Sequence, residues 1–296
     1  IGIRDPQIDA AQPTDLIVAV IADTPEIVSD VLGRLDQLMQ GGRQGAPASS
    51  LHSLADGLAQ RPDANLVAIS VPGEYAAREA RQALASGLHV FLFSDNVSID
   101  DERDLKRFAA EKNLLVMGPD CGTSLIGGVG IGFANAVRRG TIGAIGASGT
   151  GLQEFTVQVH NAGLGISHAI GTGSRDLSDG IGGLTTLTAL DGLEADPHTQ
   201  VIALISKPPG AKTLARLAER LRTCKKPVIG CFLGAQSEID AGPFFQRARL
   251  IDEAVRLSVQ QVTGKPLSPP DQFTSPELEW MSRELAGWSP AQRYIR

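Results

Sequence analysis

This chain of 296 residues contains few cysteines and few aromatic residues, and it has no excess of positive charge. Its three cysteines, Cys121, Cys224 and Cys231, include no CxxC pair, which favours a reducing compartment over a disulfide framework. The formal net charge of −6 argues against a general binder of nucleic acids or anionic membranes. No apolar run reaches the roughly 18–20 residues of a membrane span, and we expect no signal peptide. We therefore expect a cytoplasmic protein with neither a nucleic-acid nor a membrane partner.

Small and aliphatic residues are abundant instead. Hydrophobic residues make up 42% of the sequence, aromatic residues only 4%, and there are 33 glycines, a composition typical of α/β layers. A chain of this length suffices for two domains, since domains commonly have about 100–200 residues. Because it starts at Ile1 and stops at Arg296, we expect a fragment that is truncated at both ends.

Short apolar runs alternate with amphipathic windows as far as about Gln261, which is typical of βα units on a parallel sheet. The expected strands are Asp15–Ala22, Asn65–Val71, Leu88–Ser94, Leu114–Met117, Thr141–Ala147, Gly165–Ile170, Gln200–Ser206 and Pro227–Leu233. The expected helices are Pro25–Gln40, Tyr75–Ser86, Asp100–Lys112, Gly151–Asn161, Ile181–Glu194, Ala211–Arg222 and Asp252–Gln261. Pro25 and Ser98 mark helix starts, and Gly87 and Gly163 mark helix ends.

Two glycine-rich stretches divide the chain. Residues 41–50 have the composition of a linker, and the irregular stretch from Gly127 to Gly140 separates two runs of βα units. We expect an N-terminal βα segment with its linker at 1–50, one domain at 51–139 and a second at 140–262. The tail at 263–296 holds several prolines and both tryptophans, which indicates an ordered extension rather than another layer.

The segment Gly140–Gly151 is an apolar strand that breaks into small residues and then opens a helix. Such a turn lets backbone N–H groups approach an anion, and the helix amino end adds positive dipole potential. Glycine also serves plain tight turns, so this motif alone leaves both interpretations open. The predicted phosphate-binding residues are Ser148, Gly149, Thr150 and Gly151.

A tight polar turn follows the strand Leu114–Met117, at the edge where ligands collect in open α/β sheets. Its candidate ligand-binding residues are Pro119, Asp120, Cys121, Gly122 and Thr123. The alternative is a purely structural turn in which Asp120 satisfies nearby backbone N–H groups. No histidine is tied to Cys121 by sequence, so a small buried thiol is favoured over a nucleophile.

Positively charged side chains follow two further expected strands. Gly171, Gly173 and Arg175 follow the strand Gly165–Ile170, and Lys207 follows Gln200–Ser206 directly. An arginine fork suits carboxylate or phosphate, although Arg175 has the alternative of pairing with Asp176 or Asp179 at the surface. Three successive strand ends thus offer a small-residue turn, an arginine and a lysine, which favours an anionic small-molecule substrate.

Histidines give no metal signal. His168 lies inside an expected strand, which favours a hydrogen-bonded structural imidazole. His52, His89, His160 and His198 show no metal-ligand spacing, and we predict no bound metal.

Five motifs occur in the order seen in α-subunits of succinyl-CoA synthetases: Val71–Gly73, Ser94–Val97, Met117–Thr123, Gly146–Gly151 and Ile170–Gly173. The amino-acid sequences of these motifs resemble those of the FdrA family. This family belongs to the same superfamily, that of the NDP-forming acyl-CoA synthetases. The resemblance covers about Asp15 to Gln261. It implies an α/β fold with a Rossmann-like CoA-binding-type domain at 51–139 and a flavodoxin-like ligase domain at 140–262, in which the helix after Ser148 stabilises a transferred phosphoryl group.

The sequence departs from that family pattern at three places. Ala22–Glu26 replaces the glycine-rich CoA-binding loop, Gly234–Gly242 lacks the phosphorylated histidine, and Lys207 stands where a glutamate orients that histidine. Loss of the histidine removes the covalent phosphoryl carrier, and the lysine creates a site that holds an anion.

Three functions stay open. The leading one, implied by the FdrA resemblance, is a subunit of oxamate carbamoyltransferase in allantoin breakdown, with separate protein subunits as partners. In it, backbone amides hold phosphate or carbamoyl phosphate, Lys207 and Arg175 stabilise developing charge, no cofactor is covalently bound, and CoA binding is doubtful. The alternatives are an acyl-CoA synthetase of the succinate–CoA ligase type and a non-catalytic anion-binding scaffold.

Overall fold

The computed structural model describes residues 10, 18, 20, 22–35, 51–235, 239–267 and 274–286. It divides into two compact units, 1–61 and 62–296. The expected strand Asp15–Ala22 and the linker at 41–50 fall largely or wholly outside the described residues. In the first unit, α2 (Pro25–Gly33) begins at Pro25 as predicted, and Ser53 caps α4 (Leu54–Gln60) by accepting from the Asp56 N–H.

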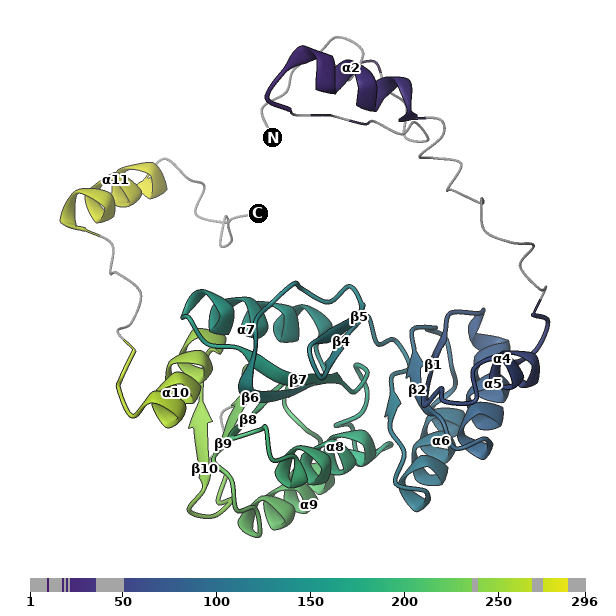
Figure 1. Cartoon of the computed structure of the whole chain (residues 1–296). Coiled ribbons are helices and arrows are strands. Elements are labelled where there is room, and N and C mark those ends of the chain that lie inside the picture. The colour runs from purple at the N-terminus through teal and green to yellow at the C-terminus, as the bar shows by residue number, and fades with distance from the viewer. Residues whose placement is uncertain are drawn as a thin grey trace. The chain divides into compact units, whose positions relative to one another are not determined.

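A three-stranded parallel sheet opens the second unit (Figure 1). Its strands lie in the order β1 (Leu66–Ile69), β2 (His89–Leu92) and β3 (Val116–Met117), and its helices are α5 (Gly73–Ala85) and α6 (Ile99–Glu111). Two local predictions are confirmed here. Ser98 caps α6 by accepting from the Asp101 N–H, and Gly87 adopts a φ of +82° where α5 has ended.

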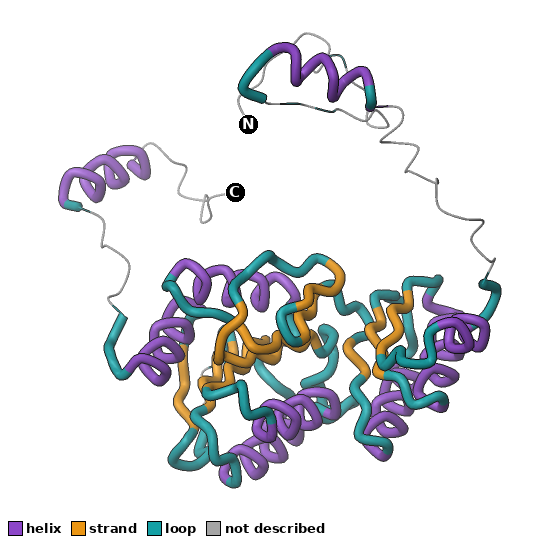
Figure 2. The backbone as a smooth tube through the Cα atoms, viewed as in Figure 1, coloured by secondary structure: helices purple, strands orange, loops and turns teal. Residues whose placement is uncertain are grey.

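The larger sheet has seven strands in the order β10-β9-β8-β6-β7-β4-β5. Figure 2 shows strands in orange and helices in purple. The strands of this sheet are β4 (Thr123–Ile126), β5 (Val129–Gly132), β6 (Arg139–Gly146), β7 (Ile166–Gly171), β8 (Val201–Ser206), β9 (Val228–Phe232) and β10 (Phe245–Ala248). The helices are α7 (Gly149–Asn161), α8 (Leu184–Ala195), α9 (Ala211–Arg222) and α10 (Ile251–Thr263). Five strands run parallel, while β4 pairs antiparallel with both β7 and β5. The α/β class with parallel sheets is confirmed.

The core lies on both faces of the larger sheet, as β8 shows. Ile202 and Leu204 belong to one apolar cluster with residues of α8 and α9. Val201, Ala203 and Ile205 belong to the other, with residues of α7 and α10. Side chains alternate between faces along a strand, so a strand buried on both faces is continuously apolar. Helices cover both faces of this sheet (Figure 1).

The structure adds elements that the sequence analysis did not expect. The β4–β5 hairpin belongs to the larger sheet, so the change of sheet comes at the turn before Thr123, earlier than the glycine-rich stretch chosen as a boundary. The hairpin is glycine-rich and short, and its register is set by pairing with the distant β7. The tail forms α11 (Ser275–Ala286), in which no residue is buried.

Strand order reverses at β6, which lies between β7 and β8. The chain leaves β6 through α7 to reach β7 on one side, and it then crosses through α8 to β8 on the other. Open α/β sheets leave a crevice at the carboxyl ends of the strands at such a point. The fold therefore places the turns after β6, β7 and β8 together. Among the described residues, none of the helices combines the length and the hydrophobicity that a membrane span requires.

Candidate functional site

The turn after β6 presents the amino end of α7. Ser148 is the N-cap, and its side chain accepts a hydrogen bond of 3.2 Å from the Gly151 N–H. Gly149 and Thr150 are exposed in the first turn, whereas Gly151 is buried. Because the first N–H groups of a helix lack intrahelical partners, Gly149 and Thr150 have backbone donors suited to an anion.

These residues line a pocket of about 310 Å³, hereafter the α7 pocket. Its lining residues are Asp120, Gly122, Thr123, Phe133, Ala147, Ser148, Gly149, Thr150, Gln153, Ser174 and Lys207. The structure thus brings together seven of the predicted site residues, from the turns after β3, β6 and β8. Pro119, Cys121, Gly151, Gly171, Gly173 and Arg175 are not among its lining residues.

Lys207 and Asp120 give the α7 pocket one positive and one negative side chain. Lys207 is exposed directly after β8 and is followed by two prolines. Asp120 adopts a φ of +56°, and its Oδ2 accepts a hydrogen bond of 3.1 Å from Ser174 Oγ. An aspartate in this left-handed region is uncommon, so its position is fixed by the surrounding turn.

Cys121 is a structural thiol. It is 3% exposed, and its Sγ lies 3.6 Å from the Thr123 carbonyl oxygen. Burial raises the pKa of this thiol, which disfavours the nucleophilic thiolate. The expectation of a small buried thiol is confirmed.

Gly171 and Gly173 bring two turns into contact rather than lining the pocket. The Gly171 N–H donates to Ser124 Oγ at 3.0 Å, and a Cβ on Gly171 would overlap the Thr123 carbonyl oxygen. Gly173 has a φ of +83° and packs against the backbone of Pro119. Both positions need glycine for close backbone approach.

The structure directs Arg175 away from the α7 pocket. Its Nη2 lies 2.8 Å from Glu102 Oε2 and donates to the Val97 carbonyl oxygen at 2.8 Å. Neither Asp176 nor Asp179, the partners considered from sequence, is its ion-pair partner among the described residues. Because α6 lies beside the turn after β7, Glu102 captures the guanidinium, a contact across 73 residues that sequence spacing does not reveal.

Four residues that line the α7 pocket were not predicted from the sequence, and one of them, Ala147, directly precedes Ser148. Phe133 is 67% exposed, Ser174 belongs to the turn after β7, and Gln153 lies in α7. Gln153 Nε2 donates to Thr123 Oγ1 at 2.7 Å and to the Phe133 carbonyl oxygen at 3.1 Å. The one available signal was helical spacing, which puts Gln153 one turn after Gly149 on the same face.

A second pocket of about 580 Å³ adjoins the first, since both share Asp120, Gly122 and Phe133. Its other lining residues follow β1 and β2 and include Phe93 and Asp95. The rings of Phe93 and Phe133 meet edge to face, with centroids 5.6 Å apart. Among the described residues, no lysine or arginine lines this pocket, so a polyphosphate there would face two carboxylates without a compensating cation.

His168 has structural partners. Its Nδ1 accepts from the Gly127 N–H at 3.2 Å, and its Nε2 lies 3.5 Å from Asp196 Oδ2. The prediction of a hydrogen-bonded structural imidazole is confirmed. Within the part of the chain that the structure describes, no cluster of three or more histidine, cysteine, aspartate or glutamate residues is placed to hold a metal.

Comparison with known proteins gives a domain match and several relatives. A family model described as CoA binding domain matches residues 137–221, from β6 to α9, whereas the resemblance placed that type of domain at 51–139. The uncharacterized protein YahF of Escherichia coli is 48% identical over 79% of this chain and 45% of its own length. The α-subunit of the ADP-forming succinate–CoA ligase of Methanothermobacter thermautotrophicus is 28% identical over 66% of each chain.

Solved structures support the fold. ATP citrate lyase from Methanothrix soehngenii, in complex with citrate and coenzyme A, matches 82% of this chain and 47% of its own with a TM-score of 0.57 at 15% identity. The chain thus spans less than half the length of YahF and of this lyase chain. The domain match and the ligase relatives thus show that part of this chain is similar to the superfamily of succinyl-CoA synthetase α-subunit-like acyl-CoA synthetases. The lyase structure shows a similar fold.

Proposed function

We propose that this chain is a subunit of an acyl-transferring enzyme of that superfamily, and that the α7 pocket binds inorganic phosphate or the phosphate of an acyl phosphate. The observation that carries this proposal is the meeting of the amino end of α7 with Lys207 in one pocket of about 310 Å³. A helix amino end and an ammonium group both favour negative charge, and lysine acts on phosphate as a point charge.

In the proposed reaction, an oxygen of hydrogen phosphate attacks the acyl carbon. The bond from that carbon to the leaving nitrogen or sulfur breaks, and the leaving atom takes the proton from phosphate, so that an acyl phosphate forms. The N–H groups of Gly149 and Thr150 and the ammonium of Lys207 hold the phosphate during attack. Catalysis then rests on positioning and on fixed charges rather than on a protein nucleophile.

Carbamoyl transfer is the finer function that we propose within this class. The segment Gly234–Gly242 has no histidine to carry a phosphoryl group, and transfer from oxalurate to phosphate, which yields oxamate and carbamoyl phosphate, needs no such carrier. We propose that separate subunits complete the site and that the enzyme acts in the cytoplasm. Acyl-CoA synthesis is the second candidate, favoured by the succinate–CoA ligase relatives.

Calorimetric titration of the full chain tests the proposal. Inorganic phosphate, carbamoyl phosphate and coenzyme A are titrated into the wild type and into the Ser148→Ala, Lys207→Ala double variant. Lys265→Ala is the matched control, because it removes another exposed lysine, outside the pocket.

We expect both phosphates to bind the wild type and the control, and to bind the double variant at least about tenfold more weakly. Tight CoA binding would favour the synthetase reaction. Absence of phosphate binding to the wild type would refute the proposed site.

A further inference from the structure

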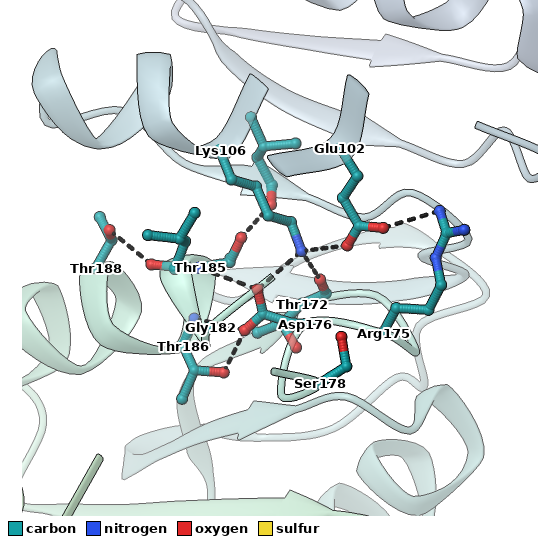
Figure 3. Close-up of polar contacts among 12 residues, drawn as sticks. Glu102, Lys106, Thr172, Arg175, Asp176, Ser178, Gly182, Thr185, Thr186 and Thr188 are labelled. Carbon is teal, nitrogen blue, oxygen red and sulfur yellow. Dashed lines mark hydrogen bonds and ion pairs between the residues drawn. The ribbon is translucent and has the colours of Figure 1, made fainter. Parts of the chain in front are cut away.

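Four charged side chains form a network between α6 and the turn after β7 (Figure 3). Glu102 and Lys106 come from α6, and Arg175 and Asp176 come from the turn. The side chains of Glu102, Lys106 and Asp176 are at most 1% exposed, whereas that of Arg175 is 38% exposed. Two positive and two negative groups balance each other, as buried charges require.

Lys106 uses all three of its N–H donors inside the protein. Its Nζ lies 2.8 Å from Glu102 Oε1, 2.8 Å from Asp176 Oδ1 and 2.9 Å from the Thr172 carbonyl oxygen. An ammonium group has three donors and no acceptor, so this coordination is complete. Complete coordination offsets the high desolvation cost of a buried ammonium group.

Asp176 is equally well coordinated. Its Oδ1 also accepts from the Thr185 N–H at 3.1 Å, and its Oδ2 accepts from both the N–H and the hydroxyl of Thr186, at 2.9 and 2.7 Å. Asp176 therefore satisfies donors at the amino end of α8, whose N-cap, Gly183, has no side chain. Glu102 Oε2 has its Arg175 partner at ion-pair distance but without hydrogen-bond alignment.

Lys106 thus holds both ends of residues 172–176, through the Thr172 carbonyl and the Asp176 carboxylate (Figure 3). The middle of this turn, Ser174, lines the α7 pocket and donates to Asp120. A residue that fixes both ends of a five-residue turn limits where its middle can lie.

We propose that Lys106 is a positioning residue for the α7 pocket, acting through Asp176 on the placement of Ser174 and Asp120. This inference rests on the proposed function, in that phosphate affinity is one of its readouts. The competing interpretation is that the network only holds the two sheets together, in which case its loss lowers stability without a specific effect on the pocket.

The test is the Lys106→Met, Asp176→Asn double variant in the full chain. Removal of both partners leaves no buried lone charge, because Glu102 keeps Arg175, and it avoids the large penalty of breaking a buried pair from one side. The matched control is Ser167→Ala, Thr199→Val. It removes a buried hydrogen-bonded pair of the same sheet, 2.7 Å apart, at the amino ends of β7 and β8.

Two quantities are measured for each protein: hydrogen exchange of residues 172–176 and the affinity for inorganic phosphate. Each measurement is made at a temperature that lies the same number of degrees below that protein's own midpoint of thermal unfolding. We expect the double variant to lose exchange protection across 172–176 and to bind phosphate about tenfold more weakly, with neither change in the control. If residues 172–176 of the double variant are as protected from hydrogen exchange as those of the wild type, the inference is overturned. This holds even if neither the wild type nor any variant binds phosphate. Lost protection with wild-type phosphate affinity would also overturn the inference, while leaving the phosphate site intact.

Discussion

Ser174 donates a hydrogen bond of 3.1 Å to Asp120 and so joins the turn after β7 to the turn after β3, across 54 residues of sequence. Both residues line the α7 pocket, and Asp120 also lines the adjoining pocket that contains Phe93. A carboxylate therefore lies where the two pockets meet, in the same pocket as Lys207. The negative charge of Asp120 opposes a bound anion, whereas the positive charge of Lys207 favours it. The effect of each charge on phosphate affinity can be measured.

Asp120→Asn is expected to tighten phosphate binding. The substitution removes a negative charge that repels phosphate, while asparagine still accepts from Ser174 and tolerates a positive φ. Because Asp120 is exposed, we expect phosphate affinity to rise by up to about fivefold, and this increase shrinks as ionic strength rises. Calorimetric titration at low and high salt measures it.

Ser174→Ala serves as the control, because it removes the hydrogen bond that Asp120→Asn retains and leaves the charge of Asp120 in place. Weaker phosphate binding by Asp120→Asn than by the wild type would show that the carboxylate supports the pocket instead of opposing its anion.

Gly171→Ala is expected to lower the free energy of unfolding by about 2 kcal/mol or more, as overpacking commonly does. The new Cβ would overlap the Thr123 carbonyl oxygen, a backbone atom that cannot move aside as a flexible side chain can. Urea unfolding monitored by circular dichroism measures the loss.

Gly192→Ala is the matched control, since no atom lies within 4 Å of its new Cβ inside α8. We expect this variant to gain roughly 0.5–1 kcal/mol. A loss at Gly192 as large as that at Gly171 would contradict the packing argument.

The three cysteines are expected to resist alkylation in the folded protein. Cys121, Cys224 and Cys231 are all buried free thiols, and burial raises the pKa of each, that of Cys231 to about 11. Iodoacetamide at pH 8 should therefore label the native chain slowly and the urea-unfolded chain fully, as mass spectrometry would show. Rapid native labelling of Cys121 would contradict its assignment as a structural thiol.

Stability is expected to fall as the pH drops below about 6.5, the usual value for histidine. Burial lowers the pKa of His89 and of His168, so that between the folded and unfolded values the unfolded chain binds more protons, and stability rises with pH across that window. Nδ1 of His89 accepts from the Leu115 N–H, and protonation of that nitrogen breaks the hydrogen bond.

Thermal unfolding of the wild type and of His89→Gln from pH 5 to 7.5 checks this expectation. The variant should show a shallower dependence on pH. An identical pH dependence of stability in the wild type and in the variant would exclude His89 as a contributor to that dependence.

The sequence determined the α/β class and most of the elements of the second unit. Seven of the expected strands are found among the described residues. β8 and β9 are buried along their whole length, and such strands read as short continuous apolar runs. The helix starts at Pro25 and Ser98 followed from local chemistry. The anion-binding turn at Ser148 was readable for the same reason, since a strand, a turn of small residues and a helix are adjacent in the chain.

Which strand ends meet and which charges pair follows from long-range packing. Asp120, Ser148 and Lys207 share a pocket because strand order reverses at β6, and strand order is not encoded in local periodicity. Arg175 was expected in that pocket, yet it pairs with Glu102 of α6. Lys106, which the sequence presents as one more helix lysine, is buried against Asp176, 70 residues away. Local patterns fix what each segment forms, whereas long-range packing fixes what each side chain touches.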